Sequence, residues 1–379
     1  MNRMASSLES SSPVKSSFSS GWPSLLFAVA VAGAAVYAFS HRPPPPFAPT
    51  QVQPDRIQIN GVVQAGERLV AVGELGRILV ANDSKGGWHE AKVDKPRGST
   101  LTQVLAIDGA LIAVGHDGWI LRSEDQGETW KEVQFVAEGG DPLLGVAGPY
   151  DGTLFAYGSF GLFLTSSDGG KTWTKSTLVE EGAAPAAAEA PPAEAAAPAA
   201  DDPWADPFAN VGKAESGIGD RHLNAMTRAA DGSLWLVGER GLLLQSRDKG
   251  ATWKDHPGVY AGSFFGMLSL PSRGLLAFGM RGNAYYSTDS GQTWNKSKIP
   301  ESLSLFGGAV TSQNEIILVG ASNAVFVSRD GGSNFTRMSP VNQKSLTAVL
   351  SLKSGDIVTA GEGGVELGGL NAQPKGVTP

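Results

Sequence analysis

The chain has 379 residues, a net charge of −7 and only 18% charged residues, so it lacks the basic excess that a nucleic-acid partner requires. It contains no cysteine, which excludes disulfides, thiol nucleophiles and cysteine-ligated zinc. Its 49 glycines and 23 prolines favour an all-β architecture with many turns over a helical one.

The N-terminal region predicts a membrane segment. Residues 1–21 are serine-rich and predict a disordered tail, whereas residues 22–40 are uncharged, mostly apolar and long enough as a helix to span about 28 Å. We expect a retained anchor in a bacterial inner membrane, with the rest of the chain in the periplasm. A cleaved signal peptide is the alternative, because residues 38–40 loosely fit a cleavage site. Residues 41–46 predict a stiff proline-rich spacer.

A repeat of about 41–43 residues extends over the rest of the chain. Its marker is an apolar strand that ends in a Gly-x-x-Gly turn, and the first glycines are Gly73, Gly115, Gly158, Gly238, Gly279, Gly320 and Gly361. Each unit has room for four short strands, which is the spacing of propeller blades. The sequence therefore predicts a seven-bladed β-propeller over residues 47–370, followed by a tail at 371–379.

A second element, Ser-x-Asp-x-Gly-x-Thr-Trp, closes most units and resembles the Asp-box, or BNR, repeat. We expect a tight hairpin in which the carboxylate accepts backbone N–H groups, the glycine adopts a positive φ and the tryptophan packs between blades. The expected structural residues are Asp125, Gly127, Trp130, Asp168, Gly170, Trp173, Asp248, Gly250, Trp253, Asp289, Gly291, Trp294 and Asp330. Their repetition favours a structural role over calcium binding or catalysis.

The seventh unit ends after three strands. Because an open blade edge is unfavourable, we expect residues 47–52 to supply the missing outer strand and to close the ring.

The Gly-x-x-Gly turns should lie on the face opposite the Asp-boxes, and their central residues differ from blade to blade. Such variation on a repetitive scaffold is typical of a binding surface. We expect Arg240 and Arg281, on adjacent blades, to be the main anchors for a partner. The other candidate binding residues in these turns are Glu239, His116 and Asp117.

One unit carries an insertion, residues 180–220, between blades three and four. It begins as an Ala/Pro/Glu run that predicts disorder and then presents Trp204 and Phe208 in an acidic stretch. These aromatics either fold back onto the propeller or form a docking motif that orders on a partner.

The sequence gives little support for catalysis, and we expect no enzyme, metal or cofactor. The five histidines are far apart, and no phosphate-binding glycine loop precedes a helix. Sialidases share Asp-boxes and a propeller, but they require an arginine triad and a tyrosine nucleophile. Here Arg56-Ile57-Gln58 lacks the proline of their Arg-Ile-Pro motif, and tyrosine is scarce at six residues.

The repeats Ala113–Val133 and Leu236–Asp255 resemble the photosystem II stability and assembly factor family. The resemblance covers about residues 47–370 and implies a non-enzymatic propeller that helps to assemble or stabilise a membrane complex. Family members bind photosystem subunits through an arginine-rich surface, whereas here the arginines are scattered and the Ala/Pro insertion is foreign.

We therefore expect a membrane-tethered scaffold that binds an integral membrane protein complex, with an RND-type transporter as the working hypothesis. No small-molecule substrate is expected. A carbohydrate- or polymer-binding propeller is the alternative from another class, and a sialidase-like hydrolase is the third.

Overall fold

The computed structural model describes residues 22–40, 56–82, 87–181, 218–339 and 343–368. The chain divides into two compact units, residues 1–51 and 52–379. In the first unit, helix α1 (Trp22–Phe39) is apolar along its length, and none of its residues is buried. Of the helices that the structure describes, only α1 is long and apolar enough to cross a membrane, a property that anchors and signal sequences share.

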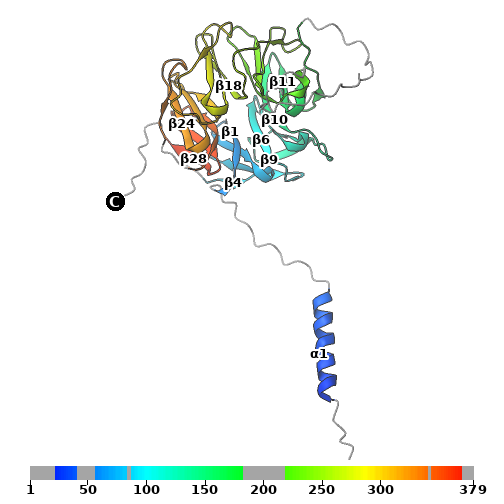
Figure 1. The fold of residues 1–379 in the computed structure, drawn as a ribbon. Helices are drawn as coiled ribbons and strands as arrows, with labels where there is room; N and C mark the ends of the chain where they lie inside the picture. The colour runs from blue at the N-terminus through cyan, green and yellow to red at the C-terminus, as the bar shows by residue number, and fades with distance from the viewer. Residues whose placement is uncertain (1–21, 41–55, 83–86, 182–217, 340–342, 369–379) are drawn as a thin grey trace, which may run out of the picture. The chain divides into compact units, whose positions relative to one another are not determined.

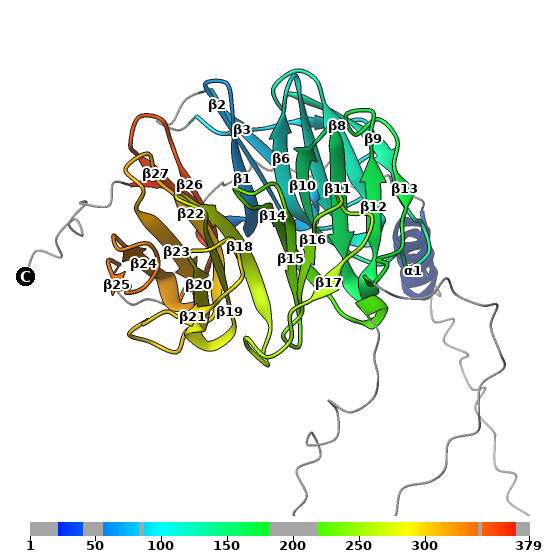
Figure 2. The same ribbon diagram turned by 90° about the horizontal axis from the view of Figure 1, so that it is seen from above.

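The second unit is a seven-bladed β-propeller, as the repeat predicts (Figure 1). Each blade is an antiparallel sheet whose strands follow chain order, with the first strand innermost (Figure 2). Blades one to four contain β1 (Ile59–Ala65), β2 (Arg68–Gly73), β3 (Ile78–Ala81) and β4 (His89–Glu90); β6 (Leu101–Ile107), β7 (Ala110–Gly115), β8 (Ile120–Ser123) and β9 (Thr129–Gln134); β10 (Leu143–Tyr150), β11 (Thr153–Gly158), β12 (Phe163–Ser166) and β13 (Thr174–Lys175); and β14 (Leu223–Arg228), β15 (Leu234–Gly238), β16 (Leu243–Ser246) and β17 (Lys254–Asp255).

The remaining three blades follow the same order. They contain β18 (Phe264–Leu270), β19 (Gly274–Gly279), β20 (Ala284–Ser287) and β21 (Asn295–Lys296); β22 (Leu305–Val310), β23 (Ile316–Gly320), β24 (Ala324–Ser328) and β25 (Thr336–Arg337); and β26 (Leu346–Ser351), β27 (Ile357–Gly361) and β28 (Gly364–Gly368). The ring closes where β26 packs beside β1, and the hydroxyl of Thr347 donates a hydrogen bond of 2.5 Å to the carbonyl oxygen of Ile59.

The core of the propeller lies between neighbouring blades. Second strands are buried on both faces, so they are continuous apolar runs rather than alternating ones; every residue of β7 (ALIAVG) is buried. Each pair of neighbouring blades shares its own apolar cluster, such as the one that joins Val70 and Val72 of blade one to Leu111 and Leu121 of blade two. Burial between blades therefore holds the ring together.

The first glycine of each Gly-x-x-Gly turn is required by close packing. At Gly158 the backbone is extended, and a Cβ would lie 2.0 Å from the carbonyl oxygen of Pro142, just before the first strand of the same blade. That carbonyl oxygen accepts the N–H of Ser159 at 2.9 Å. The equivalent hydrogen bond forms in all seven blades of the described chain, which explains why the glycine recurs.

The outer edges of three blades are covered by the chain that leaves the preceding blade. Short parallel pairings form between these residues: Lys92 and Thr129, where β5 (Lys92–Val93) pairs with β9; Glu180 and Trp253; and Lys298 and Asn334. Blade seven has three strands within the described chain. The predicted closing strand, residues 47–52, lies outside the described residues, although Ile57 packs in one cluster with Ala360 and Val365 of blade seven.

Candidate partner-binding face

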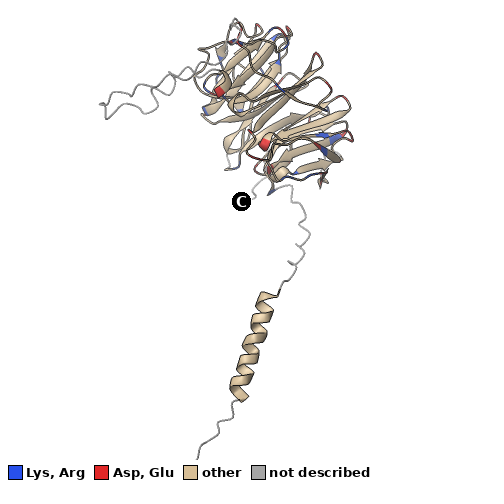
Figure 3. Ribbon diagram, turned by 90° about the vertical axis from the view of Figure 1, so that its right-hand side faces the viewer, with Lys and Arg blue, Asp and Glu red and all other residues tan. Residues whose placement is uncertain are grey.

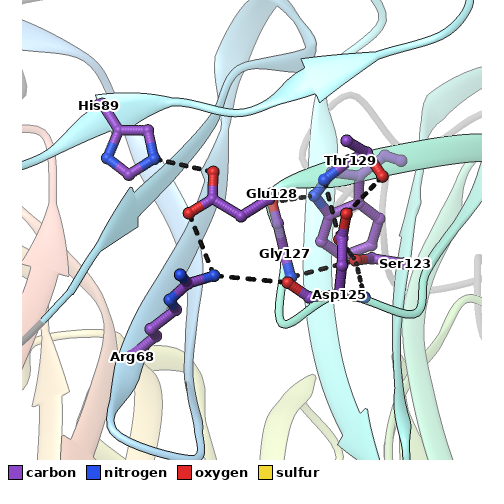
Figure 4. Close-up of polar contacts among 8 residues, drawn as sticks. Arg68, His89, Ser123, Asp125, Gly127, Glu128 and Thr129 are labelled. Carbon is purple, nitrogen blue, oxygen red and sulfur yellow. Dashed lines mark hydrogen bonds and ion pairs between the residues drawn. The ribbon is translucent and has the colours of Figure 1, made fainter.

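The Asp-box turns occupy one face of the ring, and in blade two the turn is a closed hydrogen-bond network (Figure 4). Asp125 accepts the backbone N–H of Thr129 at 2.9 Å, the hydroxyl of Thr129 at 2.6 Å and the hydroxyl of Ser123 at 2.8 Å. Ser123 in turn accepts the N–H of Gly127, and the indole of Trp130 donates to the carbonyl oxygen of Gly127 at 2.8 Å. The carboxylate is thus fully engaged inside the turn.

The same network recurs in four further blades. Asp168, Asp248 and Asp289 each accept a threonine hydroxyl at 2.6 Å, and Asp330 accepts the side-chain amide of Asn334 at the same distance. Hydrogen bonds from Thr172 and Ser166 hold the pKa of Asp168 well below its usual range. Partial burial alone would raise the pKa of Asp289, but hydrogen bonds from Thr293 and Ser287 outweigh it and lower the pKa to about 2.

The other expected Asp-box residues support these turns. Gly127, Gly170, Gly250 and Gly291 all have φ between 78° and 94°. Trp130 and Trp253 are buried, and the indoles of Trp253 and Trp294 donate to the carbonyl oxygens of Gly250 and Gly291. The indole nitrogen of Trp173 is buried and has no hydrogen-bond partner within the described structure.

Side chains of the Asp-box face also join blade one to blade two (Figure 4). Arg68 lies 3.1 Å from Glu128 and donates to the carbonyl oxygen of Asp125 at 3.4 Å. His89 lies 3.0 Å from the other oxygen of Glu128. At this junction the polar side chains of the Asp-box face are therefore paired with one another.

The opposite face carries the Gly-x-x-Gly turns, which form 3₁₀ turns η2 (Glu74–Gly76), η3 (His116–Gly118), η4 (Ser159–Gly161), η6 (Met280–Gly282) and η7 (Ala321–Asn323). The second residue of each of these five turns, and Arg240 in the equivalent turn of blade four, is left-handed, with φ of 50–57°; in chain order these residues are Leu75, Asp117, Phe160, Arg240, Arg281 and Ser322. A left-handed backbone costs a non-glycine residue about 1–2 kcal/mol. Six blades tolerate this strain while varying the side chain that they present.

Two of these side chains are apolar and strongly exposed. Leu75 is 65% exposed and Phe160 is 62% exposed. The ring of Phe160 meets the ring of His222 edge-to-face at a centroid distance of 5.0 Å. Phe160 thus combines a left-handed backbone with a largely exposed ring that contacts the ring of His222.

The predicted anchors Arg240 and Arg281 are both exposed on this face. Arg240 lies 3.3 Å from its neighbour Glu239, which also lies 3.9 Å from His222. Arg281 forms no ion pair with any described residue, and its N–H donates to Ser304 at 3.4 Å. The structure therefore groups Glu239 and Arg240 with His222 and leaves the guanidinium of Arg281 without a carboxylate.

The remaining predicted binding residues differ in their availability. His116 is exposed, whereas the carboxylate of Asp117 accepts the hydroxyl of Ser99 at 2.5 Å and its carbonyl oxygen accepts the N–H of Val136. Trp204 and Phe208 lie outside the described residues. The described chain resumes at η5 (Ile218–Asp220) beside η4, where Gly161 donates to the carbonyl oxygen of Arg221 at 2.9 Å. The insertion thus returns to the propeller next to Phe160.

The central channel has a volume of about 300 Å³ and is lined by the first strands of all seven blades. Among the residues that the structure describes, its lining contains no carboxylate, histidine, lysine or arginine. Asn60, Thr102, Asn224 and Thr347 each donate to a carbonyl oxygen of the next blade, so these polar groups serve the ring.

Blades five and six depart from this pattern. At the position that holds asparagine or threonine in four blades, they carry Phe265 and Phe306, whose rings lie 5.8 Å apart; Phe306 is 37% exposed. We did not predict this pair from the sequence. Aligning the first strands of the seven repeats would have revealed it, because two phenylalanines replace small polar residues there.

Charged residues are dispersed over the propeller. In Figure 3 they lie chiefly on turns and connections, and most of the strand surface is uncharged. Within the described residues, no three histidine, aspartate or glutamate side chains are grouped so as to hold a metal ion. The Gly-x-x-Gly face therefore carries a mixture of side chains: cations on blades four and five, and exposed apolar side chains on blades one, three and six.

Comparisons with known proteins agree with this architecture. Residues 54–194 match the DUF6242 beta propeller domain family, and residues 285–296 match the BNR/Asp-box repeat. No curated protein matches the chain significantly. The two matches together cover less than half of the chain.

Several solved structures are similar to this chain over most of their length. YCF48 bound to D1 peptide is 17% identical with a TM-score of 0.59, covering 83% of this chain and 93% of that one. YCF48 from Cyanidioschyzon merolae is 16% identical with a TM-score of 0.59, covering 83% and 96%. A streptogramin B lyase structure is 13% identical with a TM-score of 0.62, covering 84% and 96%. At such identities the similarity shows the propeller fold alone.

Proposed function

We propose that this protein is a non-enzymatic scaffold whose Gly-x-x-Gly face binds a segment of an integral membrane protein complex and aids its assembly, stability or activity. One observation carries the proposal. On a ring whose Asp-box carboxylates are satisfied within their own turns, the opposite face presents exposed apolar and cationic side chains at strained, variable positions: Leu75, Phe160, Arg240 and Arg281. Strain kept at variable positions is typical of functional surfaces.

The composition of this face indicates the chemistry of the partner. Arg240 and Arg281 favour carboxylates, and the exposed rings of Phe160 and Phe306 favour apolar side chains. A partner segment that combines acidic and apolar residues fits best. YCF48, one of the similar structures, carries a bound D1 peptide, which supports peptide binding on a propeller of this type.

The apolar helix α1 supports the proposal that the scaffold acts at a membrane. We propose that α1 is a retained anchor in a bacterial inner membrane and that the propeller lies in the periplasm, where an RND-type transporter is our candidate complex. The absence of cysteine suits any compartment, so the proposal depends on the apolar length of α1.

The test is affinity purification of the tagged full-length protein from native membranes in mild detergent, with mass spectrometry of co-purifying proteins. We expect one stoichiometric integral membrane partner, which is lost in the double variant Arg240→Ala/Arg281→Ala. Arg247→Ala/Arg273→Ala is the matched control, because these arginines are exposed on the same two blades beside the Asp-box turns.

A further variant, Trp204→Ala/Phe208→Ala, tests whether the insertion contributes to the same contact. Equal recovery of the partner by wild type and by the Arg240/Arg281 variant would show that this face does not bind it. Purification of the protein alone would refute the scaffold function.

A second candidate function, carbohydrate binding, is favoured by a hollow between blades four and five, which is lined by His256, Tyr285 and Trp294 among others. Carbohydrate binding at this hollow would use none of the residues of the Gly-x-x-Gly turns, so substitutions can test the two candidate functions independently.

A further inference from the structure

The junction between blades four and five differs from its neighbours. At the junctions before blades two, four and six, the incoming chain pairs in parallel with the outer edge of the next blade. Among the described residues, no such pairing forms with the outer edge of blade five. Pro257 has no N–H to donate, and Gly258, with φ of 90°, turns the chain away. The outer edge of blade five near Trp294 is therefore left uncovered by the chain.

This missing pairing leaves a hollow of about 450 Å³. Its walls include Asp255, His256 and Gly258 from blade four and the chain that follows it, and Tyr285, Gln292 and Trp294 from blade five. Its volume lies in the range of small-ligand sites.

The aromatic walls are held in place by rings packed beneath or beside them. His256 and Trp294 both pack against the fully buried Trp235, at centroid distances of 5.0 and 5.7 Å. Tyr285 stacks on Tyr260 at 5.7 Å. The rings therefore form a pre-arranged surface that needs little reordering to receive a ligand.

Two polar groups lack partners here, one in the wall of the hollow and one behind His256. One carboxylate oxygen of Asp255 is buried and has no hydrogen-bond partner in the described structure. The same holds for the side-chain amide nitrogen of Gln245, a residue only 4% exposed, whose oxygen lies 3.2 Å from the ring of His256. Asp255 itself is half-buried in the wall of the hollow, so a ligand there would meet a carboxylate that the protein leaves incompletely hydrogen-bonded.

The local charges are balanced. Burial lowers the pKa of His256; Lys254 and Arg247 lower it further, whereas Asp255 and Glu181 raise it. The lowered pKa favours the neutral imidazole, and the cations and carboxylates that act on it are equal in number. This environment favours a neutral ligand that carries hydrogen-bond donors over an ion of either sign.

We propose that the hollow between blades four and five binds a neutral saccharide, with a sugar ring against Trp294 and Tyr285 and hydroxyl groups donating to Asp255. Aromatic rings match the apolar face of a sugar, and a charged carboxylate is a strong acceptor for its hydroxyls. Gln292 and His256 add hydrogen-bonding groups at the rim. This site is separate from the proposed partner-binding face and does not depend on it.

The proposal is tested by titrating the full-length protein, in a detergent without a sugar headgroup, with cellotriose and with the neutral N-acetylglucosamine trimer. The cationic glucosamine trimer and the anionic galacturonic acid trimer serve as charged probes. Calorimetry gives the affinity, and tryptophan fluorescence reports on Trp294. We expect saturable binding of a neutral trimer and a clear preference for it over both charged ones.

Two variants separate binding from folding. Asp255→Asn should weaken binding about 10-fold, since it removes a charged acceptor, and should not lower the melting temperature, because the lost oxygen has no partner in the protein. Trp294→Phe keeps a ring in the Asp-box turn and should weaken binding about 3-fold. Asp141→Asn, at an exposed aspartate between blades two and three, is the control and should leave binding unchanged.

Three outcomes would overturn the proposal: no binding of either neutral trimer, equal binding by Asp255→Asn and wild type, or binding of the glucosamine trimer alone, which would indicate an ammonium site. A fall in the melting temperature of Asp255→Asn would assign Asp255 a structural role and would equally overturn it. The Arg240/Arg281 variant should bind the trimer normally, so failure of this proposal is distinct from failure of the scaffold function.

Discussion

The two faces of the ring use similar residues in opposite ways. On the Asp-box face, Asp125 and its counterparts are enclosed by hydrogen bonds from their own turn, and Arg68 is paired with Glu128 of the next blade. On the Gly-x-x-Gly face, Arg281 has no carboxylate partner among the described residues, and Phe160 is exposed. The Asp-box side chains recur in the repeat because they stabilise their own turns. The central side chains of the Gly-x-x-Gly turns differ between blades and make fewer such contacts, which is why we propose that they bind a partner.

The largest loss of stability should come from a substitution at the first glycine of a Gly-x-x-Gly turn. Gly158→Ala would place a Cβ 2.0 Å from a backbone oxygen, so we expect a loss of about 3 kcal/mol or more in the free energy of unfolding. Gly219→Ala is the control, because a Cβ there meets nothing within 4 Å. Urea unfolding of the full-length protein in detergent measures both. Equal stability of the two variants would contradict the packing explanation of the repeat.

An Asp-box substitution should have a smaller effect. Asp289→Ala removes the acceptor for Thr293 and Ser287, and we expect a loss of about 1–2 kcal/mol in the free energy of unfolding. Asp108→Ala, at an exposed turn aspartate on the same face, should change stability by less than about 0.5 kcal/mol. The same urea titration compares them. A structural role for the Asp-box predicts this difference, and its absence would argue for a ligand-binding role instead.

The Asp-box carboxylates should also make stability dependent on pH. The folded pKa of Asp289 is about 2, below its ordinary value of 3.8, so its contribution is present above pH 4 and is lost as the pH falls towards 2. After solvent screening we expect about 1 kcal/mol from this residue. The measurement is the difference in unfolding free energy between wild type and Asp289→Asn at pH 5 and at pH 2.5. A difference that does not shrink at the lower pH would contradict the lowered pKa.

A substitution on the Gly-x-x-Gly face should increase the free energy of unfolding rather than lower it. Phe160→Gly relieves a left-handed backbone but increases the entropy of the unfolded chain, and we expect a net gain of about 0.5 kcal/mol in stability together with weaker partner binding. Ser159→Gly, where φ is negative, should destabilise by about 0.5–1 kcal/mol. Thermal melting and partner recovery are measured on the same preparations. A destabilised Phe160→Gly variant would assign this ring to packing.

The smallest effect on stability should accompany the largest effect on binding. Arg240→Ala/Arg281→Ala removes exposed side chains, so the free energy of unfolding should change by less than about 0.5 kcal/mol while the partner is lost. Urea unfolding beside the affinity purification checks both parts. A variant that both unfolds and loses the partner would leave no contrast between the two faces.

The repeat in the sequence was sufficient to predict the fold and the chemistry of its turns. Seven glycines at regular spacing predicted seven blades, and the hydrogen bonds of the Asp-box join residues no more than four positions apart, so their pattern is visible in a short stretch of sequence. The predicted binding residues Arg240 and Arg281 could be placed on one face for the same reason, because each lies within a local turn.

Only the tertiary structure showed which side chains of neighbouring blades contact one another. Phe265 and Phe306 are 41 positions apart and become neighbours because their strands line one channel, and Asp255 faces Trp294 because one connection fails to pair. These contacts depend on how each blade packs on the next and on whether the chain between blades donates an N–H to a distant strand. The repeat shows which positions are equivalent, as for Phe265 and Phe306. The path of the backbone in three dimensions decides which side chains meet, so a short stretch of sequence does not encode these contacts.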